Sequence, residues 1–327
     1  MKTYNVAIIG CGGIAPNHLY AINKLEGLKL ACVCDIDEEK AKNTAEKYGV
    51  KYYTDYKKMA ENEQLDGVHI CLPHYLHKEV SIYFLEKKVM VLCEKPFSIC
   101  TKDAEEMIDA SQKNNTMLDI IFQCRLSTAS RFIFNTLKQG VLGEVKEIFA
   151  QVKWKREREY YNNGKWRGYI SLAGGGSLIN QAIHTLDLAR LIAGADVESV
   201  SPQIANLNHS YVEVEDTVNA VVTFKNGAVL TFYSTNNNFE SEPISIKAVC
   251  ENGLIELTGG EATITLNDGT VLKNDKDEEF FCGVKEEYGT SHITQIYRFY
   301  FGSKDEVENN VEEALKTQML VDRIYNR

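Results

Sequence analysis

The stretch that decides the fold is "YNVAIIGCGGIAPNHLYAINKLEGLKLACVCD", residues 4–35. Its first part is a short apolar run, rich in β-branched residues, that ends at Gly10 and predicts a buried strand. A helical pattern follows over residues 17–25, and residues 28–35 form a second apolar run that ends in an acid. A strand, a glycine-rich turn, a helix and a second strand in this order are typical of a dinucleotide-binding unit.

The turn itself reads G-x-G-x-x-A from Gly10 to Ala15. Gly10 permits the tight turn, Gly12 lets backbone approach a pyrophosphate, and Ala15 lets the helix pack closely on the strand. The free amides at the start of the helix attract phosphate groups. Asp35 lies 20 residues after Ala15, where it is expected to bind the ribose hydroxyls of the cofactor. A glycine turn in an unrelated α/β fold is the alternative interpretation.

The acidic residues after the second strand bear on the choice of cofactor. Asp35, Asp37 and Glu38 would repel the 2′-phosphate of NADP, and Lys40 is the basic residue closest to them in sequence. We therefore expect NAD as the cofactor, with NADP less favoured.

Strand and helix patterns keep alternating up to residue 124. This alternation predicts an α/β fold with a doubly wound parallel sheet, whose ligands bind at the carboxyl ends of the strands. The residues expected to bind the cofactor at that edge are Gly10, Gly12, Gly13, Ile14, Asp35, Ile36, Cys71, Leu72, Pro73, His74, His77, Glu94, Lys95 and Gln123.

The composition excludes several classes of protein. The 327 residues carry a net charge of −10 without a dense basic block, which argues against nucleic acid as a partner. There is no apolar run long enough to span a membrane, and the nine cysteines form no C-x-x-C pair. We expect no metal site, no disulfide framework and a cytoplasmic location.

The second half of the chain shows a different pattern. Alternating apolar and polar runs flank Asn226–Gly227, Asn252–Gly253 and Asp268–Gly269, and each pair predicts a hairpin turn. We expect a Rossmann domain over residues 1–123, and over residues 124–327 an α+β domain with a large, mainly antiparallel open sheet. We expect the last helix to pack back on the first domain. An open sheet with one bare face predicts a homodimer or homotetramer that packs through it.

The segment "GGGSLINQAIHTLDLARLI", residues 174–192, predicts an amphipathic helix led by glycines. On a regular helix Asn180, His184 and Asp187 lie together on the polar side. The glycines are expected to let backbone pass close to a neighbour, such as the nicotinamide. Taken alone, His184 fits a structural histidine as well as a catalytic one.

Three motifs in this order, "GCGGIA" (10–15), "CEKP" (93–96) and "GGGSLINQAIH" (174–184), resemble the Gfo/Idh/MocA family of oxidoreductases over nearly the whole chain. The resemblance implies an N-terminal Rossmann domain and a C-terminal α/β domain with an open sheet. It also implies NAD(P)-dependent chemistry on a sugar, cyclitol or nucleotide sugar.

The resemblance also implies roles for particular residues. Lys95 would be catalytic and Glu94 would lie beside the nicotinamide, while Trp166 and Arg167 would bind near the cofactor. Asn180 stands where the family commonly has an aspartate. The residues expected to bind the substrate are Lys95, Arg125, Tyr161, Trp166, Asn180, His184 and Tyr288.

Together these features predict an enzyme in which His184 is the general base and Lys95 stabilises the substrate oxygen and shares the proton. The reverse assignment of these two roles stays open. Two other functions are compatible with the sequence. One is a glycosidase that uses NAD as an internal redox relay, and the other is a non-catalytic sensor of dinucleotides.

Overall fold

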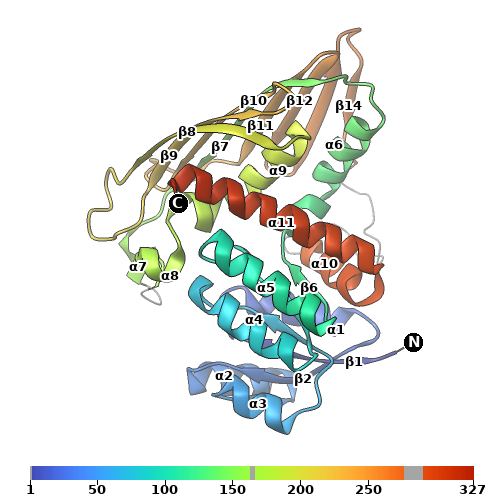
Figure 1. The fold of residues 1–327 in the computed structure, drawn as a ribbon, viewed down its shortest axis with the longest axis vertical. Coiled ribbons are helices and arrows are strands. Elements are labelled where there is room, and N and C mark those ends of the chain that lie inside the picture. Colours follow the sequence, from blue (N-terminus) through green and yellow to red (C-terminus); the bar gives the residue numbers. More distant parts are fainter. Residues whose placement is uncertain (1, 163–165, 276–289) are drawn as a thin grey trace. The chain divides into compact units, whose positions relative to one another are not determined.

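The structure is a computed structural model that describes residues 2–162, 166–275 and 290–327 (Figure 1). The chain divides into two compact units. The first consists of Met1–Gln123 and Glu279–Leu315, and the second of Cys124–Glu278 and Lys316–Arg327. Among the described helices, none is both long enough and apolar enough to cross a lipid bilayer.

The first unit is built on a six-stranded sheet in the order β3-β2-β1-β4-β5-β6, with every neighbouring pair parallel. This confirms the predicted doubly wound sheet. Its strands are β1 (Tyr4–Ile9), β2 (Leu28–Cys34), β3 (Lys51–Tyr53), β4 (Gly67–Ile70), β5 (Met90–Cys93) and β6 (Leu118–Ile120).

Helices connect the strands of this sheet, as the alternating pattern predicts. They are α1 (Ala15–Lys24), α2 (Glu38–Tyr48), α3 (Tyr56–Asn62), α4 (His77–Glu86) and α5 (Thr101–Asn114), with short 3₁₀ turns at His74–Leu76 and Gln123–Leu126. Helix α10 (Thr290–Phe301) comes from late in the sequence and packs beside α1. The core lies between them and the sheet, and it includes Val6, Ile8, Ile22 and Ile296.

The second unit contains an eight-stranded sheet in the order β14-β13-β12-β11-β7-β10-β9-β8. Its strands are β7 (Val145–Lys153), β8 (Val197–Ala205), β9 (Thr217–Phe224), β10 (Val229–Thr235), β11 (Ser245–Cys250), β12 (Gly253–Thr258), β13 (Glu261–Leu266) and β14 (Val271–Lys273). Among the described strands of this sheet β7 and β10 pair in parallel and the other neighbouring pairs are antiparallel, so the sheet is mainly antiparallel, as predicted.

All three predicted hairpins are present in this sheet. Asn226–Gly227 joins β9 to β10, Asn252–Gly253 joins β11 to β12, and Asp268–Gly269 joins β13 to β14. Gly227 and Gly269 have φ of +84° and +88°, which glycine adopts without the steric cost that a side chain brings.

One face of the second sheet is covered by helices. Helix α9 (Ile183–Ala193) packs on β7, β10 and β11, and α6 (Thr128–Lys138) packs on β13; Figure 1 shows both on the same side of the sheet. Residues alternate along β7, where Ile148 and Ala150 are buried and Phe149 is 48% exposed. The short helices α7 (Arg158–Asn162) and α8 (Ile170–Ala173) follow β7.

The predicted regular helix from Ser177 is wrong in its first part. Ser177–Ala182 is a π-helical turn, and α-helical geometry begins only at Ile183. The wider turn changes the angular spacing of the side chains before residue 183, so the helical wheel drawn from the sequence does not apply there. Helix α11 (Lys304–Tyr325) continues from the first unit into the second, where the division lies after Leu315.

Candidate active site

The glycine turn after β1 is tight on one side and open on the other. Gly10 has φ of +94°, and a Cβ built on it would lie 2.3 Å from the carbonyl oxygen of Cys71. A Cβ on Gly12 or Gly13 would meet nothing within 4 Å. Helix α1 begins after Ile14 without a side-chain cap. The turn therefore leaves room, and the positive end of a helix, for a phosphate group.

Asp35 closes the same edge at the end of β2. Its carboxylate accepts hydrogen bonds from the backbone amides of Cys11 at 2.7 Å and Asp37 at 2.9 Å. Asp35 therefore ties the glycine turn to the second strand and remains half-buried at the surface. Ile36 beside it is 92% exposed, and Lys40 forms an ion pair with Asp37 at 3.0 Å.

The loops after β4 and β5 are joined by a buried histidine. His77 faces the carbonyl oxygens of Pro96 at 2.9 Å and Leu72 at 3.0 Å and is fully buried. It thereby connects the segment that contains Cys71, Leu72 and Pro73 with the turn that follows Lys95. His74 is also buried, and Gln123 begins the 3₁₀ turn after β6.

Glu94 is held by two buried histidines. Its Oε1 lies 2.9 Å from Nε2 of His18 on α1 and 3.3 Å from Nε2 of His292 on α10, while its Oε2 accepts the backbone amide of Lys95 at 3.2 Å. Burial favours the neutral acid, but the hydrogen bonds from both histidines outweigh it and place the pKa of Glu94 well below its usual range. Glu94 is therefore an anion that fixes the backbone next to Lys95.

The histidine network continues behind Glu94. His18 Nδ1 lies 2.9 Å from Nδ1 of His69 on β4, whose Nε2 lies 3.0 Å from the hydroxyl of Tyr300. Burial lowers the pKa of His18 and of His69, so both rings are neutral at physiological pH. With His18 donating to Glu94, one consistent arrangement has Tyr300 donating to His69 and His69 donating to His18.

Sequence reasoning missed this network, although a signal was present. His18 lies on the buried face of α1, three residues after Ala15 and four before Ile22, and His69 interrupts an apolar strand. Buried polar side chains require partners. The atoms that His18, Glu94 and His292 could offer to a metal ion lie within 4.8 Å of one another. Hydrogen bonds from the two histidines to Glu94 account for this closeness.

In the second unit, the glycines before the π-helical turn make room for the chain itself. A Cβ on Gly175 would lie 2.2 Å from the hydroxyl of Tyr325, and one on Gly176 would lie 1.8 Å from the carbonyl oxygen of Glu215. These contacts explain the glycines that the sequence analysis attributed to the nicotinamide. The turn carries Asn180, and His184 follows in the first turn of α9; both are half-buried.

Glu215 holds the start of this turn. Its carboxylate accepts the backbone amides of Gly176 at 2.6 Å and Leu178 at 2.9 Å, and the hydroxyl of Tyr325 at 2.9 Å. Burial raises the pKa of Glu215, and its hydrogen bonds offset only part of that rise. Glu215 thus accepts hydrogen bonds from backbone amides that would otherwise lack partners at the start of a helix.

Asp187 and Arg125 form a buried ion pair rather than belonging to an open pocket. Asp187 accepts two hydrogen bonds from the guanidinium of Arg125, at 2.7 and 2.8 Å, and one from the hydroxyl of Thr317 at 2.5 Å. Burial favours the neutral acid, but the charge of Arg125 outweighs it and lowers the pKa of Asp187. Asp187, placed beside His184 by the sequence analysis, instead anchors α9.

Aromatic and basic side chains cluster after β7. The guanidinium of Arg167 lies over the rings of Trp166 at 4.7 Å and Tyr160 at 5.2 Å, and the Tyr160 hydroxyl bonds with the amide of Gln181. Tyr161 is buried, with its hydroxyl accepting from the amide of Asn236 at 3.0 Å.

The structure thus brings the predicted cofactor residues of the first unit to one edge of its sheet, and Lys95 lies at that edge. Tyr161, Trp166, Arg167, Asn180 and His184 belong to the second unit. Tyr288 lies outside the described residues.

Comparison with known proteins identifies the family. Residues 4–122 match the oxidoreductase family with an NAD-binding Rossmann fold, and residues 133–256 match the GFO/IDH/MocA C-terminal domain. The D-glucoside 3-dehydrogenase of Escherichia coli is 30% identical over 243 residues, which cover 69% of this chain and 68% of that protein. The chain belongs to the Gfo/Idh/MocA family of oxidoreductases.

Other members of the Gfo/Idh/MocA family extend the similarity to most of the chain. The myo-inositol 2-dehydrogenase of Thermotoga maritima is 24% identical over 301 residues, or 90% of this chain and 86% of that protein. The WlbA dehydrogenase from Bordetella pertussis, solved with NADH and UDP-GlcNAcA, shares the fold with a TM-score of 0.86. It is 24% identical and covers 99% of this chain and 96% of its own. The protein is therefore an oxidoreductase with an NAD-binding Rossmann domain.

Proposed function

We propose that this protein is an NAD-dependent dehydrogenase of a sugar, cyclitol or nucleotide sugar, acting on a carbinol carbon. The observation that carries the proposal is Lys95, a cation that follows the anion Glu94 at the carboxyl edge of β5, where a Rossmann sheet binds its ligands. The named activities of the relatives, on D-glucosides and myo-inositol, support a polyhydroxylated substrate.

In this proposal residues 1–123 form the dinucleotide-binding domain and residues 124–327 supply most of the substrate site. The open space at Gly12 and Gly13 fits the pyrophosphate, and Asp35 at the end of β2 fits the adenosine ribose. The remaining predicted cofactor contacts are Gly10, Ile14, Ile36, Cys71, Leu72, Pro73, His74, His77, Glu94, Lys95, Gln123, Trp166 and Arg167. The bound dinucleotide supplies the two-electron oxidant.

The chain itself must take the proton of the substrate hydroxyl. His184 has an imidazole suited to this role near neutral pH, and Lys95 brings a positive charge that stabilises the substrate oxygen. Glu94 and its histidines hold the backbone of Lys95 in position. We assign His184 as the base and Lys95 as the group that stabilises the oxygen and shares the proton, with the reverse assignment as the alternative.

The other predicted substrate contacts divide into two kinds. Asn180 and Trp166 are half-buried and suited to contact a sugar. Arg125 and Tyr161 are buried, and they form hydrogen bonds with Asp187 and Asn236, respectively. We therefore assign them positioning roles. Tyr288 stays in the proposed set on the strength of the sequence alone.

The open face of the second sheet supports a homo-oligomer. Phe149, Val221 and Val249 are 48%, 41% and 37% exposed on strands whose alternate residues are buried. Covering such a face with a second copy removes apolar area from water. We propose a homodimer or homotetramer built through this sheet, in the cytoplasm, where thiols stay reduced.

The direct test is the formation of NADH from NAD, or of NADPH from NADP, with a panel of hexoses, inositols, glycosides and nucleotide sugars. We expect the reduced cofactor to accumulate with one class of substrate, and to form faster from NAD than from NADP. Glycoside cleavage without release of NADH would establish the internal redox relay. Ligand-dependent NAD binding without any turnover would establish a sensor.

A further inference from the structure

A cavity of about 300 Å³ opens in the second unit at one end of its sheet. Its walls come from three segments: residues 155–158 after β7, residues 208–211 between β8 and β9, and residues 236–238 after β10. All three belong to the same compact unit, so the cavity is complete within it.

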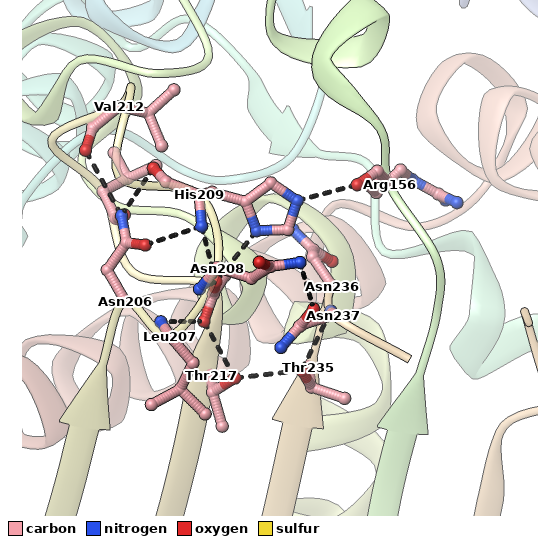
Figure 2. A network of polar contacts seen from close by, with 12 residues as sticks. Arg156, Asn206, Leu207, Asn208, His209, Val212, Thr217, Thr235, Asn236 and Asn237 are labelled. Carbon is pink, nitrogen blue, oxygen red and sulfur yellow. Dashed lines mark hydrogen bonds and ion pairs between the residues drawn. The ribbon is translucent and has the colours of Figure 1, made fainter. Parts of the chain in front are cut away.

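The cavity has a wall held by a dense polar network (Figure 2). His209, which is buried, lies 2.8 Å from the carboxylate of Asp216 and 2.8 Å from the backbone carbonyl of Arg156. Asp216 also accepts the amides of Leu207 and Asn208 at 3.0 and 2.9 Å. These bonds fix the loop after β8 against the segment after β7, so the cavity is a preformed feature of the fold.

The lining carries positive charge in a protein whose net charge is −10. The lining contains three basic residues, Lys155, Arg156 and Arg158, and one acid, Glu157, which pairs with Lys155 at 2.9 Å. Both guanidiniums are oriented by aromatic rings. Arg156 lies over Trp154 at 4.8 Å, and Arg158 lies over Tyr211 at 4.6 Å. Guanidiniums held in this way have lost part of their freedom before a ligand arrives.

A buried acceptor in the wall lacks a partner. Asn236 is 1% exposed, and its amide nitrogen donates to Tyr161, but its Oδ1 has no hydrogen-bond partner among the described residues. A buried carbonyl oxygen without a partner costs free energy unless a ligand or water donates to it. The hydroxyl of a sugar is such a donor.

We propose that this cavity binds the anionic end of a hydroxylated ligand, namely a sugar that carries a carboxylate or phosphate. Arg158 and Lys155 bind the anion, and the carbonyl oxygen of Asn236 accepts a neighbouring hydroxyl. Arg156 connects the cavity to the proposed active site, because its guanidinium donates to Gln181 at 2.9 Å, in the π-helical turn that precedes His184. The inference deepens the proposed function by specifying an acidic sugar as substrate, and it rests on that function.

The experiment is calorimetric titration of the full-length protein with inorganic phosphate, D-glucuronate, D-glucose 6-phosphate and D-glucose, in the presence of NAD at low ionic strength. We expect the three anionic probes to bind and D-glucose to bind at least about tenfold more weakly, which corresponds to about 1.4 kcal/mol. The arms distinguish carboxylate from phosphate as the preferred anion.

Variants assign the binding to this cavity. Arg158→Gln and Lys155→Gln each remove an exposed charge, and we expect each to weaken the anionic probes about tenfold while leaving D-glucose unchanged. The matched control is Lys225→Gln, which removes an exposed lysine from the turn at the opposite end of β9 and β10. We expect it to bind every probe as the parent protein does.

Two results would overturn the inference: no anionic probe binds more tightly than D-glucose, or both cavity variants bind like the Lys225→Gln control. NADH formation is measured in parallel with neutral and acidic sugars. Turnover of neutral sugars alone, without preference for the anionic probes, would contradict the proposed anion site in the cavity but support the proposed dehydrogenase activity. If the parent protein binds anions and the cavity variants do not, but no sugar is turned over, the result would support the anion site and contradict the dehydrogenase activity.

Discussion

Two glycine-rich segments, one in each unit, precede helices and look alike in the sequence, but their surroundings differ. At Gly12 and Gly13 of the first unit, added methyl groups would meet nothing within 4 Å. At Gly175 and Gly176 of the second unit, they would collide with Tyr325 and Glu215. The first turn leaves space for a ligand, whereas the second is filled by its own chain. A run of glycines therefore indicates that the backbone leaves room for a close neighbour, but it does not indicate whether that neighbour is a ligand or another part of the chain.

The strongest test of this difference is Gly176→Ala. The new methyl group would need the space of the Glu215 carbonyl, 1.8 Å away, and backbone on both sides would have to shift. We expect a loss of about 4 kcal/mol or more in the free energy of unfolding, measured by urea denaturation. Unfolding parameters equal to those of the parent protein would show that the second glycine run is not closed by the chain.

The next largest effect is expected at the anchor of α9. Asp187→Asn leaves the buried guanidinium of Arg125 without its counter-charge, which costs about 3 kcal/mol. The pKa of Asp187 is lowered in the folded protein, so its stabilisation is complete above the unfolded-state pKa of about 3.9 and is lost as the pH falls through the lower folded-state value.

The pH dependence of stability tests whether the charge of Asp187 causes this effect. Urea midpoints measured between about pH 3 and pH 7 should fall less steeply toward acid in Asp187→Asn than in the parent protein. Parallel curves for the two proteins would mean that Asp187 is not the charged partner of Arg125.

A smaller effect is expected for Glu215→Gln, which changes the carboxylate that binds the amides after the second glycine run. The amide offers one acceptor oxygen in place of two, so either an amide of the π-helical turn or the hydroxyl of Tyr325 loses a bond. We expect a loss of about 2 kcal/mol in unfolding free energy, by urea denaturation. Because the turn carries Asn180, we also expect a lower kcat. Unchanged stability would contradict the capping role of Glu215.

The smallest effect on stability is expected for Gly12→Ala, the counterpart in the first unit. The methyl group enters open space, so the free energy of unfolding should change by no more than about 0.5 kcal/mol. It would occupy the path of the pyrophosphate, and we expect the Kd for NAD, by titration calorimetry, to rise about tenfold or more. An unchanged Kd would place the cofactor elsewhere.

Much of the fold could be predicted because it depends on local patterns. The strand and helix periods of the first unit and the hairpins at Asn226–Gly227, Asn252–Gly253 and Asp268–Gly269 are visible within short windows. The features that were missed depend on residues far apart in sequence. His18 and Glu94 are separated by 76 positions, and Gly176 and Glu215 by 39. Periodicity does not report such pairs.

The candidate site shows the same division. The positions of Gly12, Asp35 and Lys95 at one edge follow from the order of strands and their carboxyl ends. The partner of Asp187 did not follow, because a helical wheel places it beside His184 but contains no information about Arg125, 62 residues earlier. The π-helical turn was likewise not predicted. The amide of Leu178 at its start bonds to Glu215, 37 residues later in the chain, and a local pattern does not report that contact.

The most direct test of the proposed chemistry is single-turnover hydride transfer by Lys95→Met and His184→Ala, with the substrate identified in the NADH panel. The matched control is Lys113→Met, an exposed lysine on α5. We expect both active-site variants to slow the transfer by about 10²–10⁴-fold, while NAD binding and the control keep their normal values. A full rate in either Lys95→Met or His184→Ala would contradict the assignment of that residue to the hydroxyl proton.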